Sequence, residues 1–242
     1  MIFFNAELIF SQSTNYTPLY TNSTFTKTIN TGLPVGTIGA KSDVANGAAN
    51  YTVPIVIPPG TNGVQPNLAI SYNSSGGDGI LGKGWGLSGL SVISRITHSI
   101  YYDGETEPVE LLGTDRFALD GQRLISKTGN YGSNGATYGA EMENFATVTS
   151  YGSYGNGPSW FKVETKDGVV MEYGNSSDSK FTNSSNSTVI YWRLNKVIYK
   201  DGNYMQFSYS NYTIAGSKES RINQILYTGN AAANLQPYNS IN

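Results

Sequence analysis

The chain has 242 residues, a formal net charge of −2, 13% charged residues and no cysteine. Because it carries no basic cluster that would neutralise phosphates, we expect no nucleic-acid binding. The absence of cysteine excludes disulfides, thiolate metal sites and a cysteine nucleophile. The composition is rich in Gly (28 residues) and Tyr (18 residues), which suit turns and half-buried strands, so it predicts an all-β fold with little or no helix.

The composition and periodicity of the sequence divide the chain into three regions. Residues 1–35 are rich in Asn, Thr and Ser without sustained periodicity, which predicts a leader or linker; the apolar start lacks a basic region and is a poor signal peptide as written. Two interpretations of the apolar start remain open: the remnant of a longer signal peptide and a plain disordered N-terminus. Residues 36–230 are the predicted β domain, and residues 231–242 a tail or the start of a further module. No apolar stretch reaches the roughly 18 residues of a membrane span, so we expect none.

The β domain opens with two strand patterns. The first, Tyr51–Ile57, ends at a turn formed by Pro58-Pro59-Gly60. Pro54 lies inside this pattern and predicts an edge strand, because proline cannot donate a hydrogen bond to a sheet ladder. Leu68–Asn73 alternates apolar and polar residues, which predicts the second strand.

Residues 76–90 are too dense in glycine for a helix and predict a tight, irregular ribbon. Its expected inward anchors are Leu81, Trp85, Leu87 and Leu90, and its structural glycines include Gly82 and Gly84. Residues 77–84 come close to a phosphate-binding loop, but Gly84 stands where that loop needs Ser or Thr, and no helix pattern follows. A glycine-rich turn is therefore favoured over nucleotide binding.

The remaining elements are predicted hairpins. Val92–Tyr102 is an expected strand, and Asp120-Gly121 is a turn signal between two short strands. Two clearer hairpins turn at Asp167-Gly168, where we expect a bulge, and at Asp201-Gly202. A last strand is expected over Arg221–Tyr227. Residues 128–139 and 150–159 are expected loops. Together these elements predict meander hairpins in large, curved, antiparallel sheets.

Few residues suggest catalysis. Glu141 and Glu143 have the Glu-x-Glu spacing of arginine-directed ADP-ribosyltransferases, but the Ser-Thr-Ser strand of those enzymes is missing, so a solvated strand or loop edge is favoured. His98 is the single histidine and is interpreted as a polar strand position. An acidic cluster in a Gly/Pro turn suggests weak calcium binding, with a solvated loop as the alternative; it comprises Asp103, Glu105, Glu107 and Glu110. We expect no cofactor.

Aromatic residues offer a second possibility, a sugar-binding face. The candidate stacking residues in Gly-rich loops are Tyr131, Tyr138, Tyr151 and Tyr154. Core packing better explains Trp85, Trp160 and Trp192.

Blocks of sequence in a fixed order resemble one family. Tyr51–Gly60, Gln65–Ser74 and Gly79–Arg95 resemble the opening of the SpvB N-terminal domain, the virulence-plasmid 65 kDa B protein family, which also begins the B component of insecticidal toxin complexes. Trp192–Tyr204 is similar to the Tyr-Asp repeat units of Rhs-type shells.

This resemblance implies a secreted, non-catalytic structural module. In the family it contributes to a hollow β shell around a toxic C-terminal polypeptide, beside a propeller that docks on a pore-forming component. The implied partners are therefore downstream shell modules with propeller and Tyr-Asp repeats. The alternatives are a glycan-binding or adhesin-like surface domain and, less favoured, an ADP-ribosyltransferase.

Overall fold

The computed structural model describes residues 40–45, 47–79, 81–183, 187–214 and 217–242. These residues form an all-β structure, as predicted, with one four-residue α-helix and one short 3-10 turn in the described ranges. The strands of the first half are β1 Lys41–Ala45, β2 Ala48–Pro54, β3 Ala69–Asn73, β4 Asp78–Gly79, β5 Gly82–Lys83, β6 Trp85–Ser88, β7 Val92–Ile96, β8 Arg116–Leu119 and β9 Gln122–Thr128. Those of the second half are β10 Thr137–Ala140, β11 Thr147–Tyr151, β12 Trp160–Glu164, β13 Val170–Tyr173, β14 Lys180–Thr182, β15 Val189–Ile198, β16 Asn203–Ile214, β17 Ser217–Asn230 and β18 Asn239–Ile241.

Eight of these strands close into an antiparallel barrel. Neighbouring strands follow the order β13-β12-β11-β10-β9-β8-β7-β15, and β13 also pairs with β15, which completes the ring. In β15, Tyr191–Arg193 pair with β7, whereas Leu194 and Val197 pair with β13. The sequence predicted curved sheets but not this closure.

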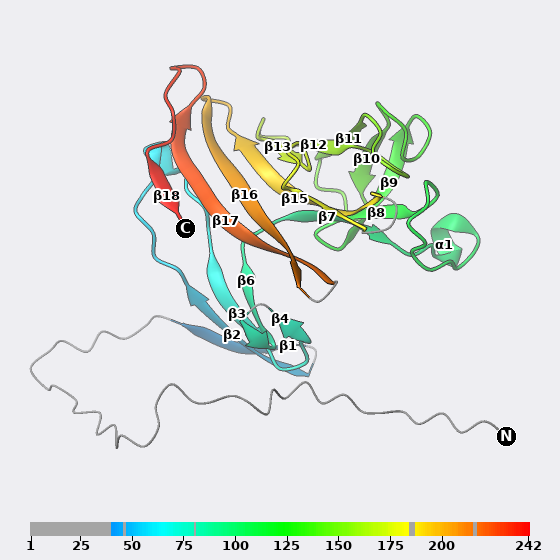
Figure 1. Ribbon diagram of the computed structural model, residues 1–242, viewed down its shortest axis with the longest axis horizontal. Helices are drawn as coiled ribbons and strands as arrows, with labels where there is room; N and C mark the ends of the chain where they lie inside the picture. The colour runs from blue at the N-terminus through cyan, green and yellow to red at the C-terminus, as the bar shows by residue number, and fades with distance from the viewer. Residues whose placement is uncertain (1–39, 46, 80, 184–186, 215–216) are drawn as a thin grey trace, which may run out of the picture. The chain divides into compact units, whose positions relative to one another are not determined.

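The same strand leads out of the barrel. Lys196–Ile198 of β15 also pair with β16, and the sheet continues through β17 to β18 (Figure 1). The β16–β17 hairpin is the longest in the described residues, with register partners from Asn203↔Asn230 to Ile214↔Ser217. Paired β structure therefore extends beyond residue 230, to Ile241 of β18.

Aromatic rings fill the core of the barrel. Phe117, Phe161 and Trp192 are almost completely buried, and each pair meets edge to face with ring centroids 5.0–5.4 Å apart. Tyr138 packs edge-on against Phe117 and Phe161. Edge-to-face packing places the positive edge of one ring against the negative face of the next. This contact stabilises the core in addition to the burial of apolar surface.

Two of the predicted anchors of the glycine ribbon, Trp85 and Leu87, lie on β6 of a separate four-stranded sheet, ordered β1-β2-β3-β6. Trp85 is half-buried and packs on Tyr72, its partner in the register, with ring centroids 5.0 Å apart. Leu87 and Leu90 pack against the core from outside. Leu81 is 50% exposed, so the prediction that it points inward was wrong. The apolar character of a side chain does not show which face of an irregular ribbon the core covers.

The glycines of the ribbon permit close backbone contact. Gly84 has φ +75°, and a Cβ there would lie 2.6 Å from the Asn73 carbonyl oxygen. A strand, β6, follows Gly84 in place of the helix that a phosphate-binding loop needs.

Pro54 lies at the end of an inner strand, so the edge-strand prediction was wrong. Strand β2 pairs with both β1 and β3. The register with β1 stops at Thr52, and Pro54 faces only Ala69 of β3. Its missing N–H therefore leaves no gap in the ladder with β1.

The hairpin turns follow the sequence closely. Asp120 and Gly121 both have positive φ between β8 and β9, as a two-residue turn requires. At Asp167-Gly168 and at Asp201-Gly202 the loop has three residues: the glycine N–H bonds back three residues, and its φ is +80° or +84°. This is the arrangement of a type I turn followed by a glycine bulge, so the bulge expected at Asp167-Gly168 is confirmed.

Three segments differ from the prediction. The strand expected over Val92–Tyr102 ends at Ile96, and α1 (Ile100–Asp103) follows, because Asp103 Oδ2 accepts a hydrogen bond from the Ser99 N–H and closes a helical turn. Two expected loops instead contribute to barrel strands, residues 137–139 to β10 and residues 150–151 to β11.

The turn at Pro58-Pro59-Gly60 docks on the sheet that leaves the barrel. The Tyr227 hydroxyl donates a hydrogen bond of 3.0 Å to the Pro58 carbonyl oxygen. The Gly60 N–H donates one of 2.8 Å to Gln65 Oε1. Val64 and Leu68, which follow this turn, are buried in the main core. The turn thus fixes the segment that joins the small sheet to the core.

We predict that Gly60→Ala destabilises the chain by about 1–3 kcal/mol, as overpacking does. A Cβ at Gly60 would lie 1.8 Å from the Val64 carbonyl oxygen, so the backbone must move. Gly113→Ala is the matched control, because a Cβ there meets no atom within 4 Å. Urea denaturation of both variants measures the difference; equal stabilities would contradict the close packing of this turn.

Candidate functional site

A buried arginine ties together one end of the barrel. Arg95 of β7 donates hydrogen bonds to the carbonyl oxygens of Val189 (2.7 Å), Leu112 (2.6 Å) and Asn156 (2.8 Å). It also forms an ion pair of 3.0 Å with Asp115, and both side chains are nearly completely buried. One side chain thereby links β7 to the start of β15 and to two loops.

The surroundings of Arg95 suit a buried charge. Its guanidinium carbon lies 5.7 Å from the Phe117 ring centroid and 5.5 Å from that of Trp192, distances typical of cation–π contacts. Burial lowers the pKa of Arg95, while the hydrogen bond and the charge of Asp115 act to raise it. Because an arginine in a protein does not lose its proton, the pair stays ionic.

A second charge cluster lies at the end of α1. Asp103 bonds Arg116 Nε (2.7 Å) and Arg123, and it accepts the Ser99 N–H (2.8 Å). Burial acts to raise the pKa of this carboxyl, but the hydrogen bonds and the two positive charges outweigh it and lower the pKa to about 2. Asp103 is therefore engaged in structure and does not join the predicted calcium cluster.

The remaining members of that cluster separate into two groups. Glu105 and Glu107 face the ring of His98, with Nδ1–oxygen distances of 3.5 and 3.8 Å. Glu110 does not belong to this group. His98 itself is 95% buried and lies beyond the end of β7, so its predicted strand position was wrong.

Glu141 and Glu143 lie in the loop between β10 and β11. Glu141 accepts a hydrogen bond of 2.8 Å from the Tyr102 hydroxyl, and Glu143 accepts the Phe145 N–H at 2.7 Å. That N–H bond is the main cause that lowers the pKa of Glu143. The two carboxylates bind different partners and do not share a strand face, which removes the geometric basis of the transferase alternative.

The tyrosines proposed for sugar stacking are mostly packing residues. Tyr131 stacks on Phe117, and its hydroxyl bonds the backbone of β8 and β9; burial raises its pKa. Tyr138 is fully buried, which contradicts its assignment to a loop. Tyr151 and Trp160 stack on each other on adjacent strands. Of the four, Tyr154 alone is substantially exposed.

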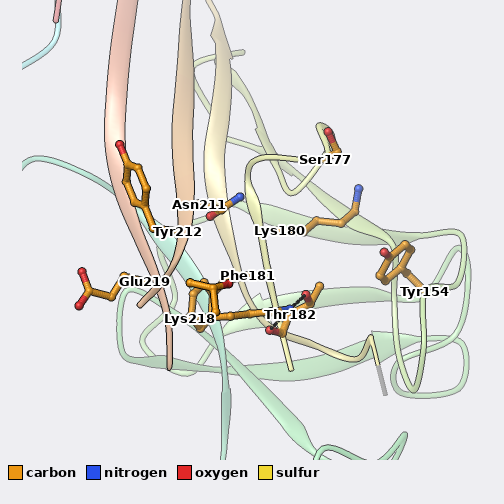
Figure 2. Close-up of a pocket in the computed structure, with 10 residues that line it drawn as sticks. Tyr154, Ser177, Lys180, Phe181, Thr182, Asn211, Tyr212, Lys218 and Glu219 are labelled. Atoms are coloured by element: carbon orange, nitrogen blue, oxygen red, sulfur yellow. Dashed lines mark hydrogen bonds between the residues drawn. The ribbon is translucent and has the colours of Figure 1, made fainter. Parts of the chain in front are cut away.

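Tyr154 borders a cleft of about 280 Å³ between β14 and the β16–β17 hairpin (Figure 2). Phe181 and the exposed Tyr212 lie on its walls. Lys218 Nζ crosses one end and donates to Thr182 Oγ1 at 3.0 Å. The cleft thus combines aromatic rings with amide and ammonium groups. Sequence reasoning missed Phe181, Tyr212 and Lys218, because β14 and β17 are far apart in the chain.

Several strand edges carry no partner in the described ranges. Strands β1 and β6 each pair on one side. Strand β17 bonds β16 along its length, but on its other edge β18 covers Ile225–Tyr227, which leaves 217–224 without a strand partner there. Such edges present backbone N–H and C=O groups that another strand can pair with.

The family model described as Salmonella virulence plasmid 65kDa B protein (SpvB) matches residues 43–236. The chain belongs to the SpvB family. Curated relatives named mono(ADP-ribosyl)transferase SpvB, from Salmonella typhimurium and Salmonella dublin, are 32% identical over 83 residues, which cover 34% of this chain and 14% of theirs. The chain therefore spans a small part of the length of these SpvB proteins.

Solved structures share the fold. The N-terminal domain of effector protein SpvB from Salmonella typhimurium strain LT2 matches with a TM-score of 0.55 and 19% identity, over 69% of this chain and 59% of that one. TcdB2-TccC3 matches with a TM-score of 0.62 and 17% identity, over 80% of this chain and 10% of that one. The Photorhabdus luminescens Tc holotoxin pore matches with a TM-score of 0.61, 18% identity and the same coverage.

The similarity to SpvB proteins is to their N-terminal domain rather than to a transferase domain. No helix in the described part of the chain is long and apolar enough to cross a membrane.

We predict that Asp115→Ala costs about 3–5 kcal/mol, because it leaves the Arg95 charge buried without a counterion. Glu219→Ala is the control, since it breaks an exposed ion pair with Arg221. Such surface pairs contribute little. Chemical denaturation measures both; similar small losses would show that Arg95 does not need its partner.

Acid titration tests the Asp103 cluster. Because the pKa of Asp103 is lowered from 3.8 to about 2, its stabilising effect is present above pH 4 and is lost as the pH falls towards 2. We predict that Asp103→Asn is less stable at neutral pH and shows a smaller loss of unfolding free energy across this window. Asp43→Asn, on exposed β1, should keep the full decline. Denaturant titrations at several pH values decide this; parallel curves for all three chains would contradict it.

Proposed function

We propose that this chain is a non-catalytic structural module of a secreted toxin-complex or Rhs-type protein. Its sheets continue into further modules to form part of a β shell around a toxic C-terminal cargo. The partners are shell segments with propeller and Tyr-Asp repeats and a pore-forming component. The match to toxin-complex chains, of which this fold is about 10%, supports a place inside a multi-component toxin.

The open edge of β17 carries the proposal. Its inner edge is bonded to β16 over the length of the hairpin, while 217–224 face no described strand on the outside. A long edge held rigid on one side is a suitable template for strand addition by a neighbouring module. The barrel anchors this sheet through β15, so the edge keeps a fixed direction.

The ionisable groups support a structural role. Arg95, Asp115 and Asp103 are buried in ion pairs that join strands and loops. Glu141 accepts a hydrogen bond from the Tyr102 hydroxyl, and Glu143 accepts one from the Phe145 N–H within a loop. A residue bound in this way is used for architecture rather than for proton transfer to a substrate.

Charge on the open edge of β17 tests the proposal. We predict that the chain self-associates with rising concentration through its open edges, and that Asn223→Lys, at an exposed position of β17, reduces this, because lysine on an edge opposes strand pairing. Ala231→Lys adds the same charge at an exposed turn outside the strands and should leave association unchanged. Size-exclusion chromatography with light scattering measures the mass. A monomer at every concentration, or an equal effect of both substitutions, would contradict the proposal.

The alternative is a glycan-binding surface domain, which the aromatic cleft between β14 and the β16–β17 hairpin favours. Exposed Tyr212 and Tyr154 border it beside Asn211. Saturable binding to a glycan array that Tyr212→Ala abolishes, with Tyr238→Ala as the exposed control, would favour this alternative over the shell.

A further inference from the structure

The ring of His98 has one nitrogen bonded and one without a partner. Its Nε2 lies 2.9 Å from the Thr114 carbonyl oxygen. A carbonyl oxygen accepts only, so Nε2 carries the proton of the neutral ring and Nδ1 holds a lone pair. Nδ1 is buried and has no hydrogen-bond partner among the described residues. A buried nitrogen of this kind normally has a partner.

Two carboxylates converge on this nitrogen. Glu105 Oε1 lies 3.5 Å and Glu107 Oε2 3.8 Å from Nδ1. These distances exceed the 2.7–3.2 Å of an N–H···O hydrogen bond. They are close to the separation of about 3.4 Å between two ligands of a tetrahedral ion whose bonds measure about 2.0–2.2 Å. The three ligand atoms all lie within 4.8 Å of one another.

We propose that His98, Glu105 and Glu107 form a binding site for a divalent metal ion, for which zinc is the best match. One imidazole and two carboxylates are a donor set that zinc accepts, and the hydrogen bond from Nε2 to a backbone carbonyl is the usual support of a metal-binding histidine. Both glutamates are about half exposed, so water reaches the remaining coordination positions.

The ion would fasten a loop to the barrel. His98 follows β7, and its own N–H donates a hydrogen bond of 3.0 Å to the Glu107 carbonyl oxygen. The same loop continues to Leu112 and Asp115, which bind Arg95. Metal binding therefore stabilises the folded chain by mass action, since the unfolded chain does not bring the three ligands together.

Zinc titration of the whole chain, purified without a histidine tag, tests the site. We expect one zinc ion per chain by calorimetry and a rise in melting temperature that EDTA reverses. Glu105→Gln/Glu107→Gln removes two ligands at exposed positions and should bind zinc more than about 100-fold more weakly, because even changes around the ligands cost about 10–100-fold. Glu110→Gln is the control, since it alters a neighbouring exposed carboxylate outside the group.

Nuclear magnetic resonance identifies the ligand atom. His98 is the only histidine, so the chain gives one set of imidazole signals. Zinc should shift the Nδ1 resonance of His98 in the wild-type chain and leave it in place in the double glutamine variant. An unmoved His98 signal, or equal zinc affinity in both chains, would overturn the proposal. A signal that responds to pH but not to zinc would show a protonated ring between the two glutamates instead, which also overturns it.

Discussion

Strand β15 is the constraint on which the structure depends. Its first half pairs with β7 and its second half with β13, which closes the barrel, while Lys196–Ile198 also pair with β16. One strand thus belongs both to a closed barrel and to an open sheet. The barrel supplies a core of buried rings around Trp192, and the sheet supplies edges. A module of a larger shell would require such a rigid body, with free strand edges that keep a fixed direction.

Arg95 completes this arrangement at the barrel end. Its hydrogen bonds to Val189, Leu112 and Asn156 reach three segments that no strand pairing among the described residues joins to one another. The sequence marked Arg95 as a structural position, the last residue of a block that resembles the SpvB family. Its partner Asp115 and its burial could not be predicted, because they depend on how distant loops meet at the barrel end.

Features that depend only on neighbouring residues, such as turns, could be predicted from the sequence. Asp-Gly pairs specified three hairpin turns, and the glycine density of residues 76–90 excluded a helix. Barrel closure was not predictable, because Ser94 and Tyr191 pair across almost a hundred residues with no local signal. Burial was misjudged for the same reason: Tyr138 was placed in a loop and is fully buried, whereas Leu81 was placed inward and is exposed.

The candidate metal site shows the same division. The acidic residues after Asp103 were recognisable as a cluster, but the sequence did not indicate that α1 turns the chain so that Glu105 and Glu107 face His98. Conversely, Asp103 left the cluster because Arg116 and Arg123, on the next two strands, surround it. Sequence spacing identified the residue types, and the fold selected which of them meet.

Hydrogen–deuterium exchange of the whole chain tests the central claim, the closure of the barrel by β15. If β15 closes the barrel, amides in Val92–Ser94 and Tyr191–Arg193 exchange among the slowest in the chain, together with those of β13, because both edges of these strands are paired. Amides of β1 and of 217–224 on the open side of β17 should exchange much faster. Fast exchange at the β7–β15 pairing, with slow exchange confined to the β16–β17 hairpin, would show an open sheet in place of a closed barrel.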